Sequence, residues 1–204
     1  MQRVVLATHN HKKLVELRRI VEASGLAVEV VGLDDVASYP EPAETERSFE
    51  GNALIKARVA ASATGLPALA DDSGIEVDVL NRMPGVRSAR WAGGHGDDAE
   101  NLALLLRQVD DVPDAERTAR FVCAMALVLP TGAEHVERAT MEGRLAREAR
   151  GSNGFGYDPA FLPDGHTRTT AELDPDAKDA ISHRGKAVRA MVEHLRGVLA
   201  GEAA

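Results

Sequence analysis

The amino-acid sequence predicts a single α/β domain over residues 1–204, with a mixed β-sheet flanked by helices. Two observations predict this class. Short apolar runs typical of buried strands alternate with longer segments in which apolar residues recur at helical spacing. Apolar runs at 118–129 and 135–142, joined by a turn-forming segment at 130–133, predict a hairpin and therefore antiparallel pairing within the sheet.

The N-terminal third is expected to alternate strands with helices. Its elements are, in order, a strand at 3–7, a helix that opens within Thr8–His11 and stops at Gly25, a strand at 28–33 and a helix at 48–64 closed by Gly65. The first helix carries Leu14, Leu17 and Val21 on one stripe. An acidic, proline-containing loop at 34–46 precedes the second helix, and such loops often carry functional residues.

The rest of the chain contains further strands, a polar break and two helices. Extended runs at 66–70 and 75–80 are expected to be separated by the break Asp71–Gly74, so that two carboxylates lie at the end of a strand. The later elements are a turn at 83–85, a helix from about residue 97, the hairpin, a glycine-rich loop at 151–159 and a closing helix at 182–199.

Composition and charge exclude several function classes. With a formal net charge of -8, the chain has no surplus of Lys and Arg with which to neutralise the phosphates of a nucleic-acid duplex. No stretch approaches the roughly 18 apolar residues of a membrane helix. The single cysteine, Cys123, lies in the apolar run 121–127, which predicts core packing rather than a catalytic thiol. We therefore expect a cytoplasmic protein whose partners include neither nucleic acid nor a membrane.

A polar segment at the start of the first helix suits an anion. It consists of Thr8, His9, Asn10, His11, Lys12 and Lys13. Free backbone N–H groups and the helix dipole favour negative charge at a helix start, so the segment predicts a phosphate site. The alternative is that Thr8 or Asn10 only caps the helix and Lys13 is solvated. The two histidines lack a carboxylate or cysteine companion in sequence, which argues against a metal pair.

Two adjacent carboxylates predict a cation. Asp71 and Asp72 lie in an apolar neighbourhood, where they repel each other unless a cation or hydrogen-bond donors neutralise them. Mg²⁺ suits such oxygen ligands when a triphosphate supplies the remaining ones. In the acidic loop, Glu44 is a candidate for an additional ligand, and Glu46 has an equal claim on composition. The alternative interpretation of 71–74 is an ordinary Asp-Ser-Gly turn.

Two later segments have the residues to contact a nucleotide base. The loop Gly154–Pro159 alternates glycines with aromatics, so that a ring can lie against a flat base while an acceptor or a backbone group reads its edge. Lys178 and the segment Ser182–Gly185 place donor-bearing side chains at or near a helix start. The alternatives are a tight turn with core aromatics for the loop and solvated surface charge for the donors.

Taken together and in this order, the segments resemble the inosine triphosphate pyrophosphatase family, also called the non-canonical purine nucleoside triphosphate pyrophosphatases. The resemblance spans nearly the whole chain. The motifs that carry it lie at 4–10, 48–57, 70–74, 84–90, 154–159 and 181–185 and read VVLATHN, SFEGNALIKA, ADDSG, PGVRSAR, GFGYDP and ISHRG. Each motif is short, but their order and spacing are highly specific.

The resemblance implies an elongated, two-lobed homodimer with a central cleft in each chain. It implies Mg²⁺-dependent hydrolysis of ITP, dITP and XTP to the monophosphate and pyrophosphate. Asp72 would be metal ligand and general base and Ser73 a substrate contact, while residues 8–13 and Lys56 would hold the phosphates. From the residues themselves, Glu44, and Asp71 as a further candidate, are expected to help Asp72 hold the metal. The residues implied around the base are Phe155, Gly156, Tyr157, Asp158, Lys178, His183 and Arg184.

Base selection is expected to follow from donor and acceptor matching. Inosine and xanthosine present a 6-oxo acceptor to Arg184, His183 or Lys178, whereas adenine presents an amino donor. Two other functions stay open at this point, namely a pyrophosphatase for canonical or pyrimidine nucleotides and a nucleotide-binding module without turnover. The chain has neither a P-loop signature nor a zinc motif, which argues against a P-loop ATPase and a zinc enzyme.

Overall fold

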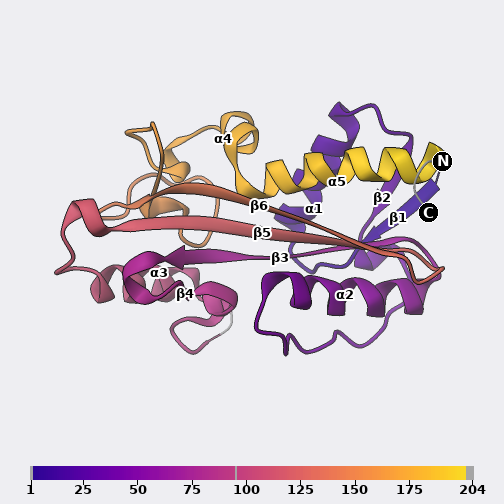
Figure 1. Cartoon of the computed structure of the whole chain (residues 1–204), viewed down its shortest axis with the longest axis horizontal. Coiled ribbons are helices and arrows are strands. Elements are labelled where there is room, and N and C mark those ends of the chain that lie inside the picture. The colour runs from indigo at the N-terminus through magenta and orange to yellow at the C-terminus, as the bar shows by residue number, and fades with distance from the viewer. Residues whose placement is uncertain (1, 95, 201–204) are drawn as a thin grey trace. The chain divides into compact units, whose positions relative to one another are not determined.

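A seven-stranded mixed β-sheet organises the chain (Figure 1). The computed structural model describes residues 2–94 and 96–200. The strands lie in the order β2-β1-β3-β5-β6-β7, and β4 pairs with β3 outside this path. β1 runs parallel to β2 and β3, whereas β4 is antiparallel to β3 and β7 is antiparallel to β6. The predicted α/β class with a mixed sheet is therefore confirmed.

The bounds of the elements follow. The strands are β1 (Gln2–Leu6), β2 (Val28–Val31), β3 (Ala68–Val77), β4 (Met83–Pro84), β5 (Thr118–Val128), β6 (Glu134–Leu145) and β7 (Phe161–Pro163). The α-helices are α1 (His11–Ala23), α2 (Phe49–Thr64), α3 (Asp98–Gln108), α4 (Pro175–Ile181) and α5 (His183–Ala200). The 3-10 helices are η1 (Leu33–Asp35), η2 (Asp78–Leu80), η3 (Gly85–Arg90), η4 (Asp114–Glu116), η5 (Asp158–Ala160) and η6 (Thr170–Glu172). Across the described ranges, none of the helices has both the length and the apolar character that a membrane crossing requires.

The described chain forms two compact units. The first contains residues 2–72, 123–139 and 184–200, and the second contains residues 73–94, 96–122 and 140–183. Each of the strands β3, β5 and β6 contributes residues to both units. The single domain and the central cleft stay predictions.

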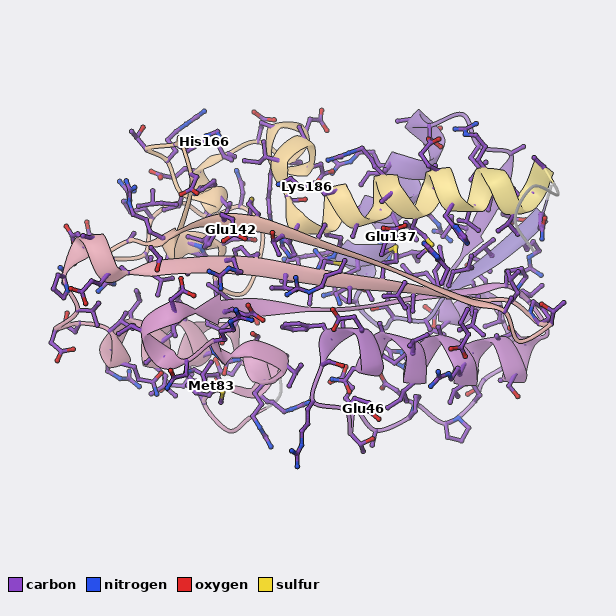
Figure 2. All side chains as sticks on the ribbon, in the orientation of Figure 1. Glu46, Met83, Glu137, Glu142, His166 and Lys186 are labelled. Carbon is purple, nitrogen blue, oxygen red and sulfur yellow. The ribbon has the colours of Figure 1, made fainter. Side chains whose placement is uncertain are left out.

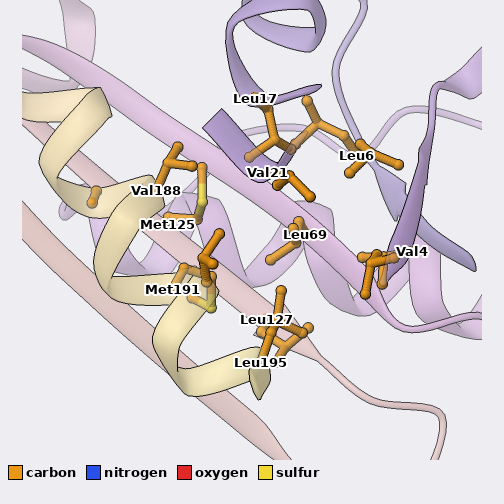
Figure 3. Close-up of a cluster of buried hydrophobic side chains, with 14 of the residues drawn as sticks. Val4, Leu6, Leu17, Val21, Leu69, Met125, Leu127, Val188, Met191 and Leu195 are labelled. Carbon is orange, nitrogen blue, oxygen red and sulfur yellow. The ribbon is translucent and has the colours of Figure 1, made fainter. Parts of the chain in front are cut away.

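In the first unit, helices pack on both sides of the strands (Figure 1). α1 and α5 share one apolar cluster with the strands, in which Leu17, Leu69, Met125 and Met191 are almost fully buried (Figure 3). Cys123 belongs to the same cluster, so its predicted packing role is confirmed. α2 lies on the other side and buries small residues, namely Ala53, Ala57, Ala60 and Ala61. Alanines bring a helix backbone close to a sheet.

The second unit has its own core of aromatic and aliphatic side chains. The rings of Phe121 and Phe161 lie 4.6 Å apart in a tilted arrangement, with an interplanar angle of 53°. Arg117 is buried beside this core. Its guanidinium donates to the carbonyl oxygens of Val109, Leu145 and Ala146. These bonds satisfy a buried cation with backbone dipoles.

The predicted break at Asp71–Gly74 is wrong. β3 runs without interruption from Ala68 to Val77, so the two carboxylates lie inside a strand rather than at its end. Polar residues signal a turn when they face water, but here side chains from elsewhere in the chain neutralise both carboxylates. The predicted turn at 83–85 also shifts: Met83–Pro84 pairs with β3, and left-handed residues lie on both sides of it, Asn81 and Arg82 before it and Gly85 after it.

Helix ends were largely predictable from their caps. Ser48 accepts a hydrogen bond from Gly51 N, and Gly65 closes α2 with a φ of 66°. Asp97 caps α3 as expected. α4 was missed because it is only 7 residues long and has too few turns for a periodic apolar pattern. Its start was nevertheless signalled by Asp174 at the cap, followed directly by a proline.

Two histidines in the first unit stack on each other. The rings of His135, on β6, and His194, on α5, have centroids 3.5 Å apart and an interplanar angle of 7°. His135 Nε2 lies 2.7 Å from Glu137 Oε1. Burial and the neighbouring His135 lower the pKa of His194, against an opposing effect of Glu137.

We predict that this stack makes stability depend on pH. The folded protein holds the pKa of His194 below the unfolded value of about 6.5, so the unfolded state binds more protons as the pH falls. The contribution is present above about pH 6.5 and is lost as the pH falls through the folded pKa. Urea unfolding of His194→Gln at several pH values should show a weaker loss of stability on acidification than the wild type. His166→Gln, in a loop, should retain the wild-type slope.

Candidate functional site

Parallel pairing of β1 and β3 brings two of the predicted motifs together. Leu6 pairs with Leu69, and Ala7 N donates to Leu69 O at 2.8 Å. The residues that follow Leu6 enter α1, whereas those that follow Leu69 are the two aspartates. The start of α1 and the carboxylates of β3 therefore meet within the first unit. We call the group formed by Lys13, Glu44, Lys56, Asp71 and Asp72 the phosphate-side cluster.

Asp71 is held by cations. Lys13 Nζ lies 2.8 Å from Asp71 Oδ2, and Arg184 Nε lies 3.5 Å from the same oxygen. The Asp71 side chain is 1% exposed. Burial alone would raise its pKa, but Lys13, Arg184 and Lys56 together outweigh burial and hold the pKa well below the usual range. Asp71 is therefore a permanent anion that fixes the position of Lys13.

Asp72 has a different environment. Asn52 Nδ2 donates to Asp72 Oδ2 at 3.0 Å, and Lys56 Nζ lies 3.9 Å from Asp72 Oδ1. Burial, reinforced by the charge of Glu44, raises the pKa of Asp72 against the opposing effect of Lys56. A carboxylate of raised pKa is a better proton acceptor. Two neighbouring aspartates thus acquire contrasting acid–base properties from the partners that reach them.

The acidic loop contributes Glu44 rather than Glu46. Glu44 Oε1 lies 2.9 Å from Lys56 Nζ. Glu46 has an exposed side chain, labelled in Figure 2, and it is the backbone N–H of Glu46 that donates to Asn52 Oδ1 at 3.0 Å. Asn52 therefore connects the acidic loop to Asp72. Sequence analysis missed this role, although Asn52 lies in one of the motifs that carried the resemblance.

The carboxylates of the phosphate-side cluster fit a substrate-completed magnesium site. Over residues 2–94 and 96–200, no three His, Cys, Asp or Glu side chains are arranged to hold a metal by themselves. Mg²⁺ commonly takes one or two protein carboxylates and completes its shell with phosphate oxygens and water. Glu44 and Asp72, which share Lys56, match that donor set. Asp71 is engaged by Lys13 and Arg184.

The segment Thr8–Lys13 divides between capping and charge. Asn10 caps α1 by accepting from the backbone N–H groups of Lys12 and Lys13, and Thr8 Oγ1 accepts from Asn10 N. His9 is exposed and lies 3.6 Å from Glu41, while His11 and Lys12 are also exposed. From this segment, Lys13 reaches the phosphate-side cluster through its ion pair with Asp71. Asn10 therefore caps α1, as the alternative interpretation of this segment predicted. Lys13, in contrast, pairs with Asp71 instead of being solvated.

A second group of predicted residues gathers around Asp158 in the second unit. The Asp158 carboxylate accepts from Phe155 N at 2.9 Å, Lys178 Nζ at 2.5 Å and Thr170 Oγ1 at 2.9 Å. Lys178 Nζ also lies 5.5 Å from the centroid of the Phe155 ring, within cation–π range. We call residues 154–158 the base loop. The Asp158 carboxylate thus fixes both this loop and Lys178. The hydrogen bond from Thr170 was not predicted from the sequence.

The two aromatic residues of the base loop have separate roles. Tyr157 is buried in the core, and its hydroxyl donates to Ser88 O at 2.7 Å. Phe155 is only partly buried. The alternative of a core aromatic thus applies to Tyr157 and leaves Phe155 as the candidate for stacking on a base. Gly154 has a φ of 78°, and a Cβ there would overlap the Asp158 carboxylate, so the loop requires glycine at this position.

His183 and Arg184 begin α5 and face different partners. The His183 ring stacks on Phe121 with centroids 4.9 Å apart. Arg184 lies in the first unit, 3.1 Å from Glu16 Oε2 as well as near Asp71. The structure therefore groups Arg184 with the phosphate-side cluster, although sequence reasoning placed it at the base. Ser73 follows Asp72 on β3 and is partly exposed.

Comparison with known proteins agrees with the motifs and the fold. The model of the Ham1 family matches residues 4–194. The chain belongs to the Ham1 family. A dITP/XTP pyrophosphatase of Cutibacterium acnes is 62% identical, with 97% of this chain and 100% of that protein covered. One of Nocardia farcinica is 59% identical, with 96% of this chain and 95% of that protein covered.

Solved structures of Ham1 proteins have the same fold. A HAM1 protein from Coxiella burnetii superposes with a TM-score of 0.88 at 43% identity, covering 96% of this chain and 99% of that one. A nucleoside-triphosphatase described as a dITP/XTP pyrophosphatase from Mycobacterium abscessus gives a TM-score of 0.78 at 55% identity, covering 93% and 98%. The resemblance to inosine triphosphate pyrophosphatases is thereby confirmed.

Removal of Arg184 should destabilise the fold. Arg184→Ala leaves the partly buried Glu16 and the buried Asp71 without one of their cations, and breaking a buried ion pair costs about 3–5 kcal/mol. Arg18→Ala is the control, because Arg18 and Asp35 form a surface pair worth about 1 kcal/mol or less. Equal losses of unfolding free energy in urea would show that Arg184 acts as a surface charge.

Proposed function

We propose that this protein is a Mg²⁺-dependent pyrophosphatase that hydrolyses ITP, dITP and XTP to the nucleoside monophosphate and pyrophosphate. Its class, a nucleoside triphosphate pyrophosphatase, follows from the relatives of that name. The observation that supports the reaction best is the environment of Asp72, a buried carboxylate of raised pKa in contact with Asn52 and Lys56. That arrangement supplies a proton acceptor beside a cation, as hydrolysis of a phosphoanhydride requires.

In the proposed reaction, water attacks the α-phosphorus and Asp72 accepts its proton. An oxygen–phosphorus bond forms to the water oxygen, the bond from the α-phosphorus to the bridging oxygen breaks, and pyrophosphate leaves. Lys13 and Lys56 neutralise charge on the phosphates, which allows a chain of net charge -8 to bind a polyanion locally. Mg²⁺, held by Asp72 and Glu44, would supply positive charge to the triphosphate oxygens.

The base loop is proposed to bind the purine. Phe155 would stack on the base, and Lys178, already 2.5 Å from Asp158, would donate to a 6-oxo group. Adenine instead presents its amino group, itself a donor, to the Lys178 ammonium, so the amino group and the ammonium are both left without an acceptor there. Such a mismatch costs about 1–3 kcal/mol, or roughly 5- to 150-fold in selectivity. His183 stays a candidate donor near the base.

A substrate panel tests the proposed function. We expect Mg²⁺-dependent release of pyrophosphate from ITP, dITP and XTP, with much slower turnover of GTP and ATP. Pyrophosphate and orthophosphate are measured separately, with EDTA as the control. Fast turnover of canonical or pyrimidine triphosphates would favour the alternative hypothesis of a pyrophosphatase for those nucleotides. Tight binding of ITP without turnover would favour a binding module.

Asp72→Asn should abolish most turnover while the protein stays folded. Loss of a general base typically costs about 10²- to 10⁴-fold in rate. Asn keeps the size of the side chain, so circular dichroism and urea unfolding should show a native fold. Glu46→Gln, which makes the same chemical change at the exposed carboxylate of the acidic loop, should retain activity. An Asp72→Asn enzyme with normal kcat would refute the assignment.

A homodimer and a cytoplasmic location are further proposals that rest on the resemblance. Light scattering of the purified protein tests the dimer. A mass of about 43 kDa, twice the 21.7 kDa of the chain, would support it.

A further inference from the structure

The base loop is tied to the first turn of α3. Gly156 N donates to Asp98 Oδ2 at 2.9 Å, across 58 residues of sequence. We propose that Asp98 is a positioning residue that sets the selectivity for the purine base by fixing the backbone of the base loop. This inference rests on the proposed function, in which the base loop binds the purine.

Asp98 is available to accept from Gly156 N because the neighbouring Asp97 caps the helix. Asp97 accepts from Glu100 N at 3.0 Å, which is the capping interaction of α3. Asp98 lies inside the helix start, where the helix dipole favours a carboxylate but no capping bond requires it. The two adjacent aspartates therefore have separable roles, one within the helix and one toward the base loop.

The helix that carries Asp98, α3, is itself held in place by hydrogen bonds. Asn101, on α3, donates to Ala89 O at 3.2 Å and accepts from Ala92 N at 2.7 Å, which ties α3 to η3 and the residues after it. The backbone carbonyl oxygen of Ser88, on η3, accepts a hydrogen bond from the Tyr157 hydroxyl. The base loop is thus connected through Gly156 and through Tyr157 to one hydrogen-bonded assembly of α3 and η3. The motif at 84–90, which the proposed reaction leaves without a role, belongs to this assembly.

The glycines of the base loop explain why the tether matters. Gly154 and Gly156 have φ values of 78° and 60° and flank Phe155. Glycine lowers the barrier to other backbone conformations, so Phe155 keeps one position only if both sides of it are held. Asp158 holds Phe155 N on one side, and Asp98 holds Gly156 N on the other. Selectivity requires that the ring and the donor of Lys178 stay fixed relative to a bound base.

The test compares three variants of the full-length protein. Asp98→Ala removes the acceptor, and Asp98→Asn retains an oxygen that can accept from Gly156 N. Asp97→Ala removes the cap of the same helix but leaves the acceptor of Gly156 N in place. We expect Asp98→Ala to lower the ratio of kcat/KM for ITP over ATP by about 5- to 10-fold, mainly through the KM for ITP. Asp98→Asn should restore most of the ratio, and Asp97→Ala should keep it despite a lower Tm.

Hydrogen exchange provides a readout that does not depend on turnover. Residues 154–158 should exchange faster in Asp98→Ala than in the wild type or in Asp97→Ala. Unchanged exchange and an unchanged ratio in Asp98→Ala would overturn the inference, as would an equal loss of ratio in Asp97→Ala. If the wild-type protein fails to hydrolyse ITP, the proposed function fails, and exchange still decides whether Asp98 holds the loop.

Discussion

The arrangement depends on neutralising two consecutive carboxylates inside a buried strand. Asp71 and Asp72 point to different partners because successive residues of a strand alternate sides, so one meets Lys13 and the other meets Asn52 and Lys56. Unpaired charges at this depth would cost several kcal/mol each. The elements that deliver these partners, α1 and α2, are therefore coupled electrostatically to β3 as well as packed against it. The contacts that stabilise the fold around Asp71 and Asp72 are therefore the same contacts that position the residues of the proposed reaction.

Contrast between the two aspartates follows from this coupling. Three cations dominate around Asp71, whereas burial and Glu44 outweigh Lys56 around Asp72. One carboxylate is a structural anion and the other is the proposed proton acceptor, although they are neighbours in the chain. In the second unit, Asp158 organises its surroundings in a similar way, since a backbone N–H, an ammonium and a hydroxyl converge on one carboxylate.

Sequence reasoning identified most of the charged residues but not their partners. Most of the longer strands, the helix caps and the glycines that close helices carry local signals and were predicted, whereas the short strands β4 and β7 were not. The break at 71–74 was wrong because the polarity of Asp71 and Asp72 is compensated by residues that are distant in sequence. Likewise, nothing local shows that the guanidinium of Arg184 meets Glu16, and the contact of Arg184 with the base stays a prediction. Asp98 has no motif at all, and only the hydrogen bond to Gly156 reveals it.

The division of the chain into two units has a consequence for biosynthesis. The chain crosses between the units after residues 72, 122, 139 and 183, so neither unit is a continuous piece of sequence. The apolar cluster of the first unit needs Val4 and Leu6 from the beginning of the chain and Met191 and Leu195 from its end. The N-terminal strands and helices consequently leave the ribosome long before the side chains that complete their core. Completion of that core must wait until Met191 and Leu195 have been synthesised, so a fragment that ends before them lacks the complete core of the first unit.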